Sequence, residues 1–188
     1  ITLGGGSIVC GAAGCAPFAA ATGRDTAWGY GIYLQSSTLE GGTVLLRGAS
    51  AGTSLSHGGV RIDSGSRVAG AQVGIVGWTG STAMVNQHGI LVQGQLEASS
   101  SLELQGTSRV SGPGASEVTA MGVRLGGSSS LTVTGGRLAI SGVTDIVPGG
   151  DDTSVELAGT SLVTGGATVS VNGQGGLWVS FSIEPGEV

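Results

Sequence analysis

The sequence predicts an all-β protein, a parallel β-helix (β-solenoid) whose short strands stack coil upon coil. Three observations support this prediction. Apolar and polar residues alternate over short segments, which is typical of half-buried strands. Clusters of Gly and Ser separate these segments and indicate turns. The apolar pattern returns about every thirty residues, a period typical of architectures in which each unit buries its apolar face against the next.

The composition favours an ordered chain with a narrow core. Glycine supplies 39 of the 188 residues, roughly three times its usual share of about 7%. Only 10% of residues are charged and 4% aromatic, and lysine is absent. The mean hydropathy of +0.33 and the regular spacing of Val, Ile and Leu argue against disorder. We therefore expect a core of small, β-branched and Leu side chains, with Gly at the turns.

The repeat is clearest between Gly89 and Gly142, where one pattern occurs twice. Gly89–Val92 leads into a Ser-Ser-Ser-Leu segment at 99–102, and Gly122–Leu125 leads into a second such segment at 128–131. We interpret the two copies as equivalent parts of consecutive coils.

A Gly-led strand marks the start of each coil. Its apolar pairs recur at nearly constant spacing, and they are Ile1/Leu3, Ile32/Leu34, Val60/Ile62, Ile90/Val92, Val123/Leu125 and Val155/Leu157. Two further apolar points follow in several coils, namely Leu39 and Val44, Val68 and Val73, Leu131 and Leu138, and Leu162 and Val169. The sequence thus predicts three short strands per coil and about six coils of ~31 residues, in a rod roughly 29 Å long.

The whole chain, 1–188, is expected to be one β-helix domain. Residues 1–30 form an irregular first coil whose Ala-rich stretch, 16–21, is expected to be a loop or a short helix. Residues 31–176 form the regular coils, and 177–188 a terminal strand that either closes the rod or starts a further coil. Polar inserts precede the Gly-led strands and are expected to be loops on one side of the rod, at 48–56, 77–87, 112–120 and 142–150.

Charge and hydropathy disfavour two classes of partner. The formal net charge is −5, the pI is about 4.8, and no basic cluster occurs, so nucleic-acid binding is disfavoured. No apolar run approaches the ~20 residues of a membrane span. Because the chain begins at Ile1, we expect a processed or excised piece.

Cys10 and Cys15 enclose four small residues, Gly-Ala-Ala-Gly. Such a loop lets the chain double back and bring two Cβ atoms within bonding reach. An even cysteine count in an exported chain favours a local disulfide. The alternative is two small buried apolar residues, and a metal site would need two further ligands.

His57 and His88 each precede a Gly-led strand, and the distance between them in the sequence is one repeat. Since one repeat is one coil, we expect the two rings to stack on one edge of the rod. Tyr30 and Met121 occupy the neighbouring equivalent positions, and without a carboxylate among them stacked surface side chains are favoured over a metal site.

Asp145, Asp151 and Asp152 form the one acidic cluster. An ordinary solvated turn is the favoured interpretation. Carboxylate oxygens on a Gly-rich turn make the three residues weak calcium candidates, and paired acids also suit glycosidic-bond chemistry. The outward positions of the Gly-led strands show no second acid pair, since they are Tyr33, Arg61, Leu91, Arg124 and Glu156. Arg124 and Glu156 are expected to pair across coils at the surface.

The repeated G-[VI]-x-[LVI] strand and the S-S-S-L-x-[VL] segment resemble those of the right-handed parallel β-helix superfamily. The resemblance covers essentially the whole chain and is strongest to Gly/Ser-rich secreted or surface members of bacteria, among the pectate-lyase-like solenoids. It implies a right-handed coil and an extracellular or cell-surface location. The superfamily contains polysaccharide lyases and hydrolases, adhesins, tailspikes and structural repeats, so the architecture does not select an activity.

We therefore expect a non-enzymatic structural or surface-display solenoid without a cofactor. Its expected partner is itself, through head-to-tail stacking into an extracellular filament, or the adjoining repeats of a longer array. One alternative is a polysaccharide lyase or hydrolase that uses the acidic cluster. Another is a carbohydrate-binding adhesin, with Trp28, Tyr30 and Tyr33 as weak sugar-stacking candidates.

Overall fold

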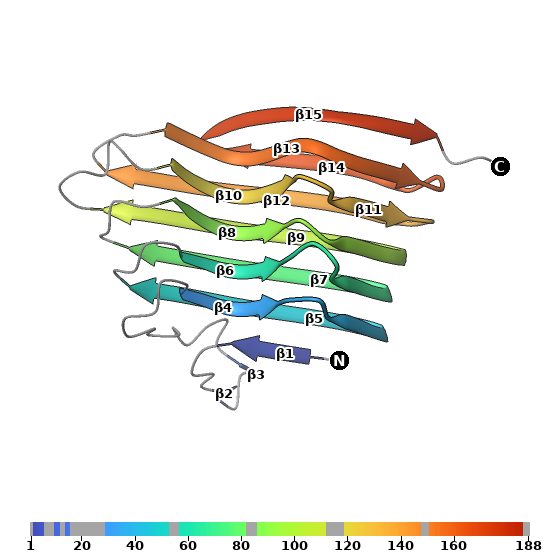
Figure 1. Ribbon diagram of the computed structural model, residues 1–188, viewed down its shortest axis with the longest axis horizontal. Helices are drawn as coiled ribbons and strands as arrows, with labels where there is room; N and C mark the ends of the chain where they lie inside the picture. The colour runs from blue at the N-terminus through green and yellow to red at the C-terminus, as the bar shows by residue number, and fades with distance from the viewer. Residues whose placement is uncertain are drawn as a thin grey trace.

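A computed structural model of the chain describes residues 2–5, 10–11, 14–15, 29–52, 57–81, 86–111, 119–147 and 151–185. The described residues form a parallel β-solenoid and contain no helix (Figure 1). Apart from one small hairpin, every described strand pairs in parallel with the strand one coil away. The predicted all-β parallel β-helix is confirmed.

Each coil contributes to three faces. Face A contains β4 (Gly29–Leu34), β6 (His57–Ile62), β8 (Gln87–Val92), β10 (Thr119–Gly126) and the first halves of β13 (Asp151–Thr164) and β15 (Gly176–Pro185). Face B contains the first residues of β5 (Thr38–Gly52), β7 (Arg67–Ser81) and β9 (Gln95–Ser111), then β11 (Ser130–Val133) and the second halves of β13 and β15. Face C contains β1 (Thr2–Gly5), the remainder of β5, β7 and β9, then β12 (Arg137–Val147) and β14 (Thr168–Gln174). The separate hairpin joins β2 (Cys10–Gly11) and β3 (Gly14–Cys15).

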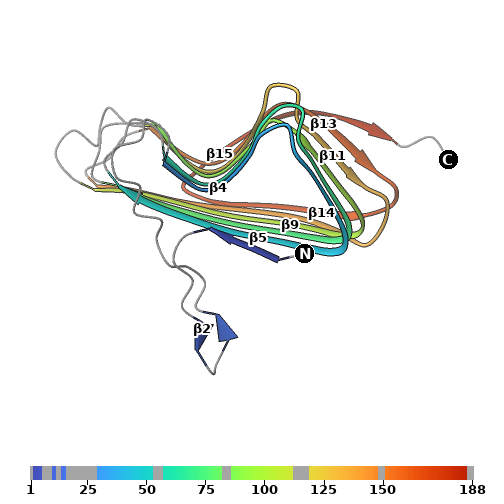
Figure 2. The same ribbon diagram turned by 60° about the horizontal axis from the view of Figure 1, so that its bottom comes forward.

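Viewed nearly along the stack, the coils superimpose (Figure 2). Face C is long and almost straight, whereas face A is curved. The face A register pairs Ile32 with Val60, Val60 with Ile90, Ile90 with Val123, and Val123 with Val155. These pairs are the expected first members of successive Gly-led strands, so the predicted spacing is confirmed from Ile32 onward. Their side chains point inward and form one apolar core with those of the other two faces.

The number of coils differs slightly from the prediction. Leu3 pairs with Leu46 on face C, so the Ile1/Leu3 pair is not the first member of the Gly-led ladder; Ile1 itself lies outside the described residues. Four turns lead from β4 through β6, β8 and β10 to β13, and β15 continues the ladder with Leu177 beside Val155. The predicted place of Ile1/Leu3 was wrong because an alternating apolar pair has the same sequence pattern on any of the three faces.

The two Ser-Ser-Ser-Leu segments are not equivalent. Leu131 pairs with Leu96 on face B, whereas Leu102 pairs with Leu138 on face C. The coil that begins at Gly89 builds its face B strand from Gln95–Ala98, before the serines. Serine suits a turn and an exposed strand position equally well, so the sequence match did not fix the register.

Part of each predicted insert is strand. β5, β7 and β12 run on into three of the inserts, to Gly52, Ser81 and Val147, and β10 begins at Thr119 inside the fourth, while 53–56, 82–85, 112–118 and 148–150 lie outside the described residues. The inward residues of these strand ends are small, for example Gly48 and Ser50. Glycine and serine alternating with other small residues give little hydrophobic contrast, so the sequence pattern of such a strand is the same as that of a polar loop.

Faces A and C touch through backbone along one line. A Cβ atom on Gly106 would lie 1.9 Å from the carbonyl oxygen of Gly122, and one on Gly77 would lie 1.9 Å from that of Gly89. No side chain fits between strands that approach so closely, which is why glycine occupies these positions. We call this line the glycine contact; it consists of Gly31, Gly59, Gly89 and Gly122 on face A and Gly48, Gly77, Gly106 and Gly142 on face C.

Gly106→Ala is expected to destabilise the protein by about 3 kcal/mol, because the new methyl group overlaps a backbone atom that cannot move without parting the two faces. Urea unfolding followed by circular dichroism measures the effect. Gly42→Ala is the matched control, since Gly42 also lies within a strand, β5, and a Cβ there would meet no atom within 4 Å. Equal effects of the two substitutions would contradict the role of the glycine contact.

Candidate functional site

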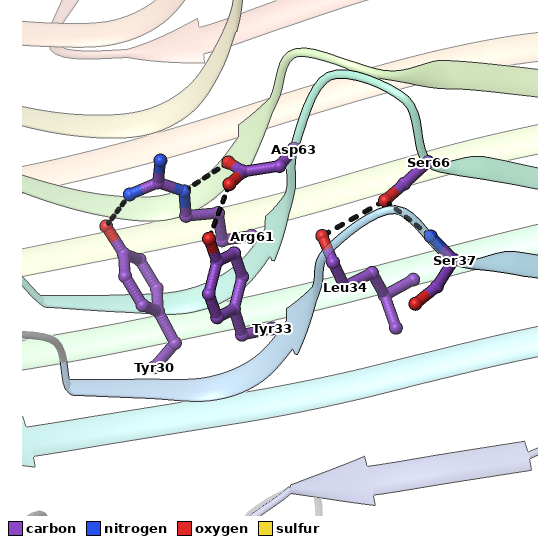
Figure 3. Close-up of polar contacts among 7 residues, drawn as sticks. All are labelled: Tyr30, Tyr33, Leu34, Ser37, Arg61, Asp63 and Ser66. Atoms are coloured by element: carbon purple, nitrogen blue, oxygen red, sulfur yellow. Dashed lines mark hydrogen bonds and ion pairs between the residues drawn. The ribbon is translucent and has the colours of Figure 1, made fainter.

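Four polar and aromatic side chains meet on the outer surface of face A (Figure 3). Tyr30 and Tyr33 lie on β4, Arg61 lies on β6, and Asp63 begins the turn that follows β6. Tyr33 and Arg61 are register partners on adjacent coils. We call these four residues the tyrosine–arginine cluster.

The local sequence explains why the rings gather there. Ile32 and Leu34 point into the core, so Tyr33 between them points outward. On the next coil Gly58 pairs with Tyr30, and a Cβ on Gly58 would lie 2.5 Å from the Tyr30 ring. The missing side chain at this position leaves space for the ring.

Asp63 and Arg61 join the two tyrosines. The Tyr33 hydroxyl donates to Oδ2 of Asp63 at 2.5 Å, and Nε of Arg61 donates to Oδ1 at 2.5 Å. Nη1 of Arg61 donates to the Tyr30 hydroxyl at 3.1 Å. The ring centroids are 5.7 Å apart with planes 35° apart, and Cζ of Arg61 lies 5.3 Å from each centroid, within cation–π range.

The turn that carries Asp63 is bound to the turn of the previous coil. The backbone N–H of Asp63 donates to the carbonyl oxygen of Leu34 at 3.0 Å. Ser66 is 1% exposed; its hydroxyl donates to the same carbonyl at 3.2 Å and accepts from the N–H of Ser37 at 3.2 Å (Figure 3). These bonds between coils fix the carboxylate relative to Tyr33.

The cluster is partly exposed and electrically balanced. Arg61 and Asp63 have 17% and 15% of their side-chain surface exposed, and Tyr33 is 42% exposed. The hydrogen bond to Asp63, together with some burial and the negative charge of the carboxylate, raises the pKa of the Tyr33 hydroxyl. A ligand at the cluster would therefore meet an aromatic surface beside an Arg–Asp ion pair whose charges cancel.

His88 lies two coils from Tyr30 in the same column of face A, between Gly58 and Met121. It is 6% exposed, and burial together with the charges of Arg124 and Arg61 lowers its pKa to about 3, so the ring is neutral at pH 7. The expected stacking of His57 on His88 is wrong, because His57 pairs with Gln87. His57-Gly58-Gly59-Val60 contains one more residue than His88-Gly89-Ile90, which shifts the histidines into different columns.

Arg124 and Glu156 pair as predicted, at equivalent outward positions of adjacent coils. Nε of Arg124 lies 3.3 Å from Oε2 of Glu156. Leu91, at the equivalent position of the preceding coil, is only 7% exposed although it points outward.

The acidic cluster is described only in part. Asp145 is exposed near the end of β12 and pairs with Arg109 of β9, with Nε and Oδ2 3.9 Å apart. Asp151 and Asp152 open β13, and their side chains lie outside the described part of the chain. Among the described residues no three His, Cys, Asp or Glu side chains form a metal-binding group. The favoured solvated turn and its weaker alternative, calcium binding by the three acids, both stay predictions.

Two further predictions fall largely on residues that are not described. Cys10 and Cys15 are opposite one another in the β2–β3 hairpin, but their side chains lie outside the described part, so the disulfide stays a prediction. Trp28 also lies outside it. Tyr30 and Tyr33, the other two sugar-stacking candidates, do come together.

Asp63 is a member of the site that the sequence pattern did not predict. The sequence contains only indirect evidence for it. Asp63 lies two residues after Arg61, and Arg61 lies one full coil after Tyr33. Only the turn geometry brings the carboxylate back over β4.

Comparison with protein-family models, with curated proteins and with solved structures found no match. Within the described ranges, no segment is a helix long and apolar enough for a membrane crossing.

Titration of the two tyrosines is expected to show one that ionises above its ordinary pKa, because the neutral Tyr33 phenol donates to the Asp63 carboxylate. Because the pKa is raised in the folded state, the hydrogen bond contributes its full stabilisation at pH values below the ordinary tyrosine pKa of ~10. This stabilisation is lost as the pH rises through the pKa of Tyr33 in the folded protein. Tyrosinate absorbance against pH measures this pKa. Tyr33→Phe should remove the absorbance change that occurs at the higher pH, and Tyr30→Phe should retain it. The reverse result would contradict the assignment of the raised pKa to Tyr33.

Proposed function

We propose that the chain is a non-enzymatic structural or surface-display solenoid that extends by adding further coils to its ends. The observation that carries this proposal is a loss of burial at the end of one column of inward side chains on face C. The side chains of this column are 0–2% exposed in four consecutive coils, at Val44, Val73, Leu102 and Leu138, but Val169 in the fifth is 39% exposed. A further coil would cover Val169 as each earlier member is covered.

The backbone supports the same proposal. Among the described strands, β14 pairs only with β12 and β15 only with β13 at one end, while β4 pairs only with β6 and β1 only with β5 at the other. Within the described part of the chain, each outer edge thus presents a row of N–H and C=O groups that suits pairing with another strand. Adjoining repeats or a second copy of this chain would provide that strand, and a head-to-tail contact between copies leads to a filament.

The expected setting of such a rod is extracellular or at a cell surface. The low charge and the abundance of Gly and Ser support this setting. The resemblance of the repeated Gly-led strand to that of the pectate-lyase-like solenoids supports kinship with them, and that kinship implies a right-handed coil. The location, the handedness and the kinship are thus parts of the proposal.

Val169→Lys is expected to abolish end-to-end association, because it places a cation where the next coil must stack. Its effect on folding should be small, since Val169 already faces solvent in part. Sedimentation velocity and electron microscopy at high protein concentration measure association. Thr168→Lys adds the same charge at the exposed neighbouring position of β14 and should leave association intact. A wild-type protein that stays monomeric at every concentration would rule out stacking between copies.

The tyrosine–arginine cluster favours a second function, carbohydrate binding. Tyr33 exposes 42% of its surface beside Arg61 and Asp63, and an aromatic surface next to paired hydrogen-bonding groups suits a sugar ring. The neutralised charge favours an uncharged glycan over an acidic one.

Tyr33→Ala is expected to reduce glycan binding at least tenfold, which corresponds to a loss of about 1.4 kcal/mol. A glycan array identifies the ligand, and titration calorimetry with that ligand measures the loss. Tyr33→Phe retains the ring and should retain most of the affinity. Binding that is unchanged in Tyr33→Ala would move the site away from this cluster.

A further inference from the structure

Beyond the glycine contact, faces A and C continue as two facing layers that enclose polar side chains. On face C the inward positions after the glycines are register partners in four consecutive coils. They all carry hydroxyl groups and are at most 7% exposed, namely Ser50, Thr79, Ser108 and Thr144. We call these four residues, with Gln87 of face A, the polar seam.

The glycine contact determines what each hydroxyl faces. A Cβ on Gly31 would lie 2.2 Å from the backbone nitrogen of Ala49, and the next residue of face C, Ser50, donates to the carbonyl oxygen of Gly29 at 2.8 Å. The facing strands therefore run in opposite directions.

The same relation holds two coils later. A Cβ on Gly89 would lie 2.4 Å from the backbone nitrogen of Thr107. Because the facing strands run in opposite directions, Ser108 lies opposite Gln87. Thr79 is the register partner of Ser108 on the adjacent coil.

The Gln87 side chain points into the polar seam. The next residue, His88, lies in the charge field of Arg61 and Arg124, which are on the outer surface of face A. Consecutive strand residues point to opposite faces, so Gln87 points inward. It is fully buried, at 0% exposure.

Four polar atoms of the polar seam have no hydrogen-bond partner in the part of the chain that the structure describes. They are Oγ1 of Thr79, Oγ of Ser108, and Nε2 and Oε1 of Gln87. Ser50 and Ser108 are the same residue type in the same column, yet only Ser50 reaches a carbonyl across the polar seam.

We propose that β7, β8 and β9 enclose a structural water site, in which at least one water molecule bridges Thr79, Ser108 and Gln87. Buried polar groups are almost always satisfied, and an internal water typically makes about three hydrogen bonds to groups that the protein leaves unpaired. The three side chains supply both donors and acceptors and carry no charge, which suits water better than an ion. The bound water connects face A to face C on the far side of the glycine contact.

A crystal structure at a resolution that shows ordered solvent tests the site directly. We expect a water within hydrogen-bonding distance of Oγ1 of Thr79, Oγ of Ser108 and the Gln87 amide. Direct hydrogen bonds among the three side chains, with no solvent density between them, would overturn the proposal.

The sign of the stability change provides a second test. Thr79→Val keeps the shape of the side chain and removes the hydroxyl. If that hydroxyl binds water, the unfolding equilibrium constant should rise about fivefold; if it has no partner, the constant should fall. Ser108→Ala repeats the test at a second position, and Thr132→Val, outside the polar seam on face B, is the control.

The double variant Thr79→Val/Ser108→Ala tests whether the two hydroxyls bind the same water. A shared water predicts a combined effect smaller than the product of the two single fold-changes. Stabilisation by either single substitution, or a combined effect equal to that product, would contradict a shared bridging water.

Discussion

The close approach of two backbones along the glycine contact is the constraint on which the cross-section depends. Gly77 and Gly106 allow faces A and C to meet with a clearance that excludes a methyl group. Because equivalent glycines recur in successive coils, the contact runs along the stack as a continuous line. It closes the apolar core at one corner and separates it from the polar seam.

The two compartments are stabilised in different ways. On one side, aliphatic side chains stack on their register partners and are removed from water. On the other, small hydroxyl residues keep the facing layers thin, so strands such as β9 extend to 17 residues without a wider core. Small residues at the inward positions of these strand ends thus produce a flat extension of the solenoid.

Charges lie on the outer surfaces and connect neighbouring coils. Arg67 pairs with Glu40 and with Glu97, the latter with Nη2 and Oε2 2.7 Å apart, and this pairing lowers the pKa of the Glu97 carboxyl. Exposed pairs of this kind contribute ~1 kcal/mol or less each. The tyrosine–arginine cluster differs because its ion pair is mostly buried and is combined with two rings. Among the described surfaces, it is therefore the one on which the proposed carbohydrate binding rests.

The sequence by itself determined the fold class, the coil length and the inward Val, Ile and Leu of face A, because hydrophobic contrast at a period of two survives in any register. It also placed Tyr33, Arg61, Arg124 and Glu156 outward. Tertiary structure alone decided the face that Leu3 joins, the separation of Leu102 from Leu131, and the approach of Asp63 to Tyr33. Those outcomes depend on where each chain segment turns, and a turn of Gly and Ser leaves the same composition whichever face follows it. The polar seam was hidden for a related reason, since a buried hydroxyl ladder and a solvated loop consist of the same small residues.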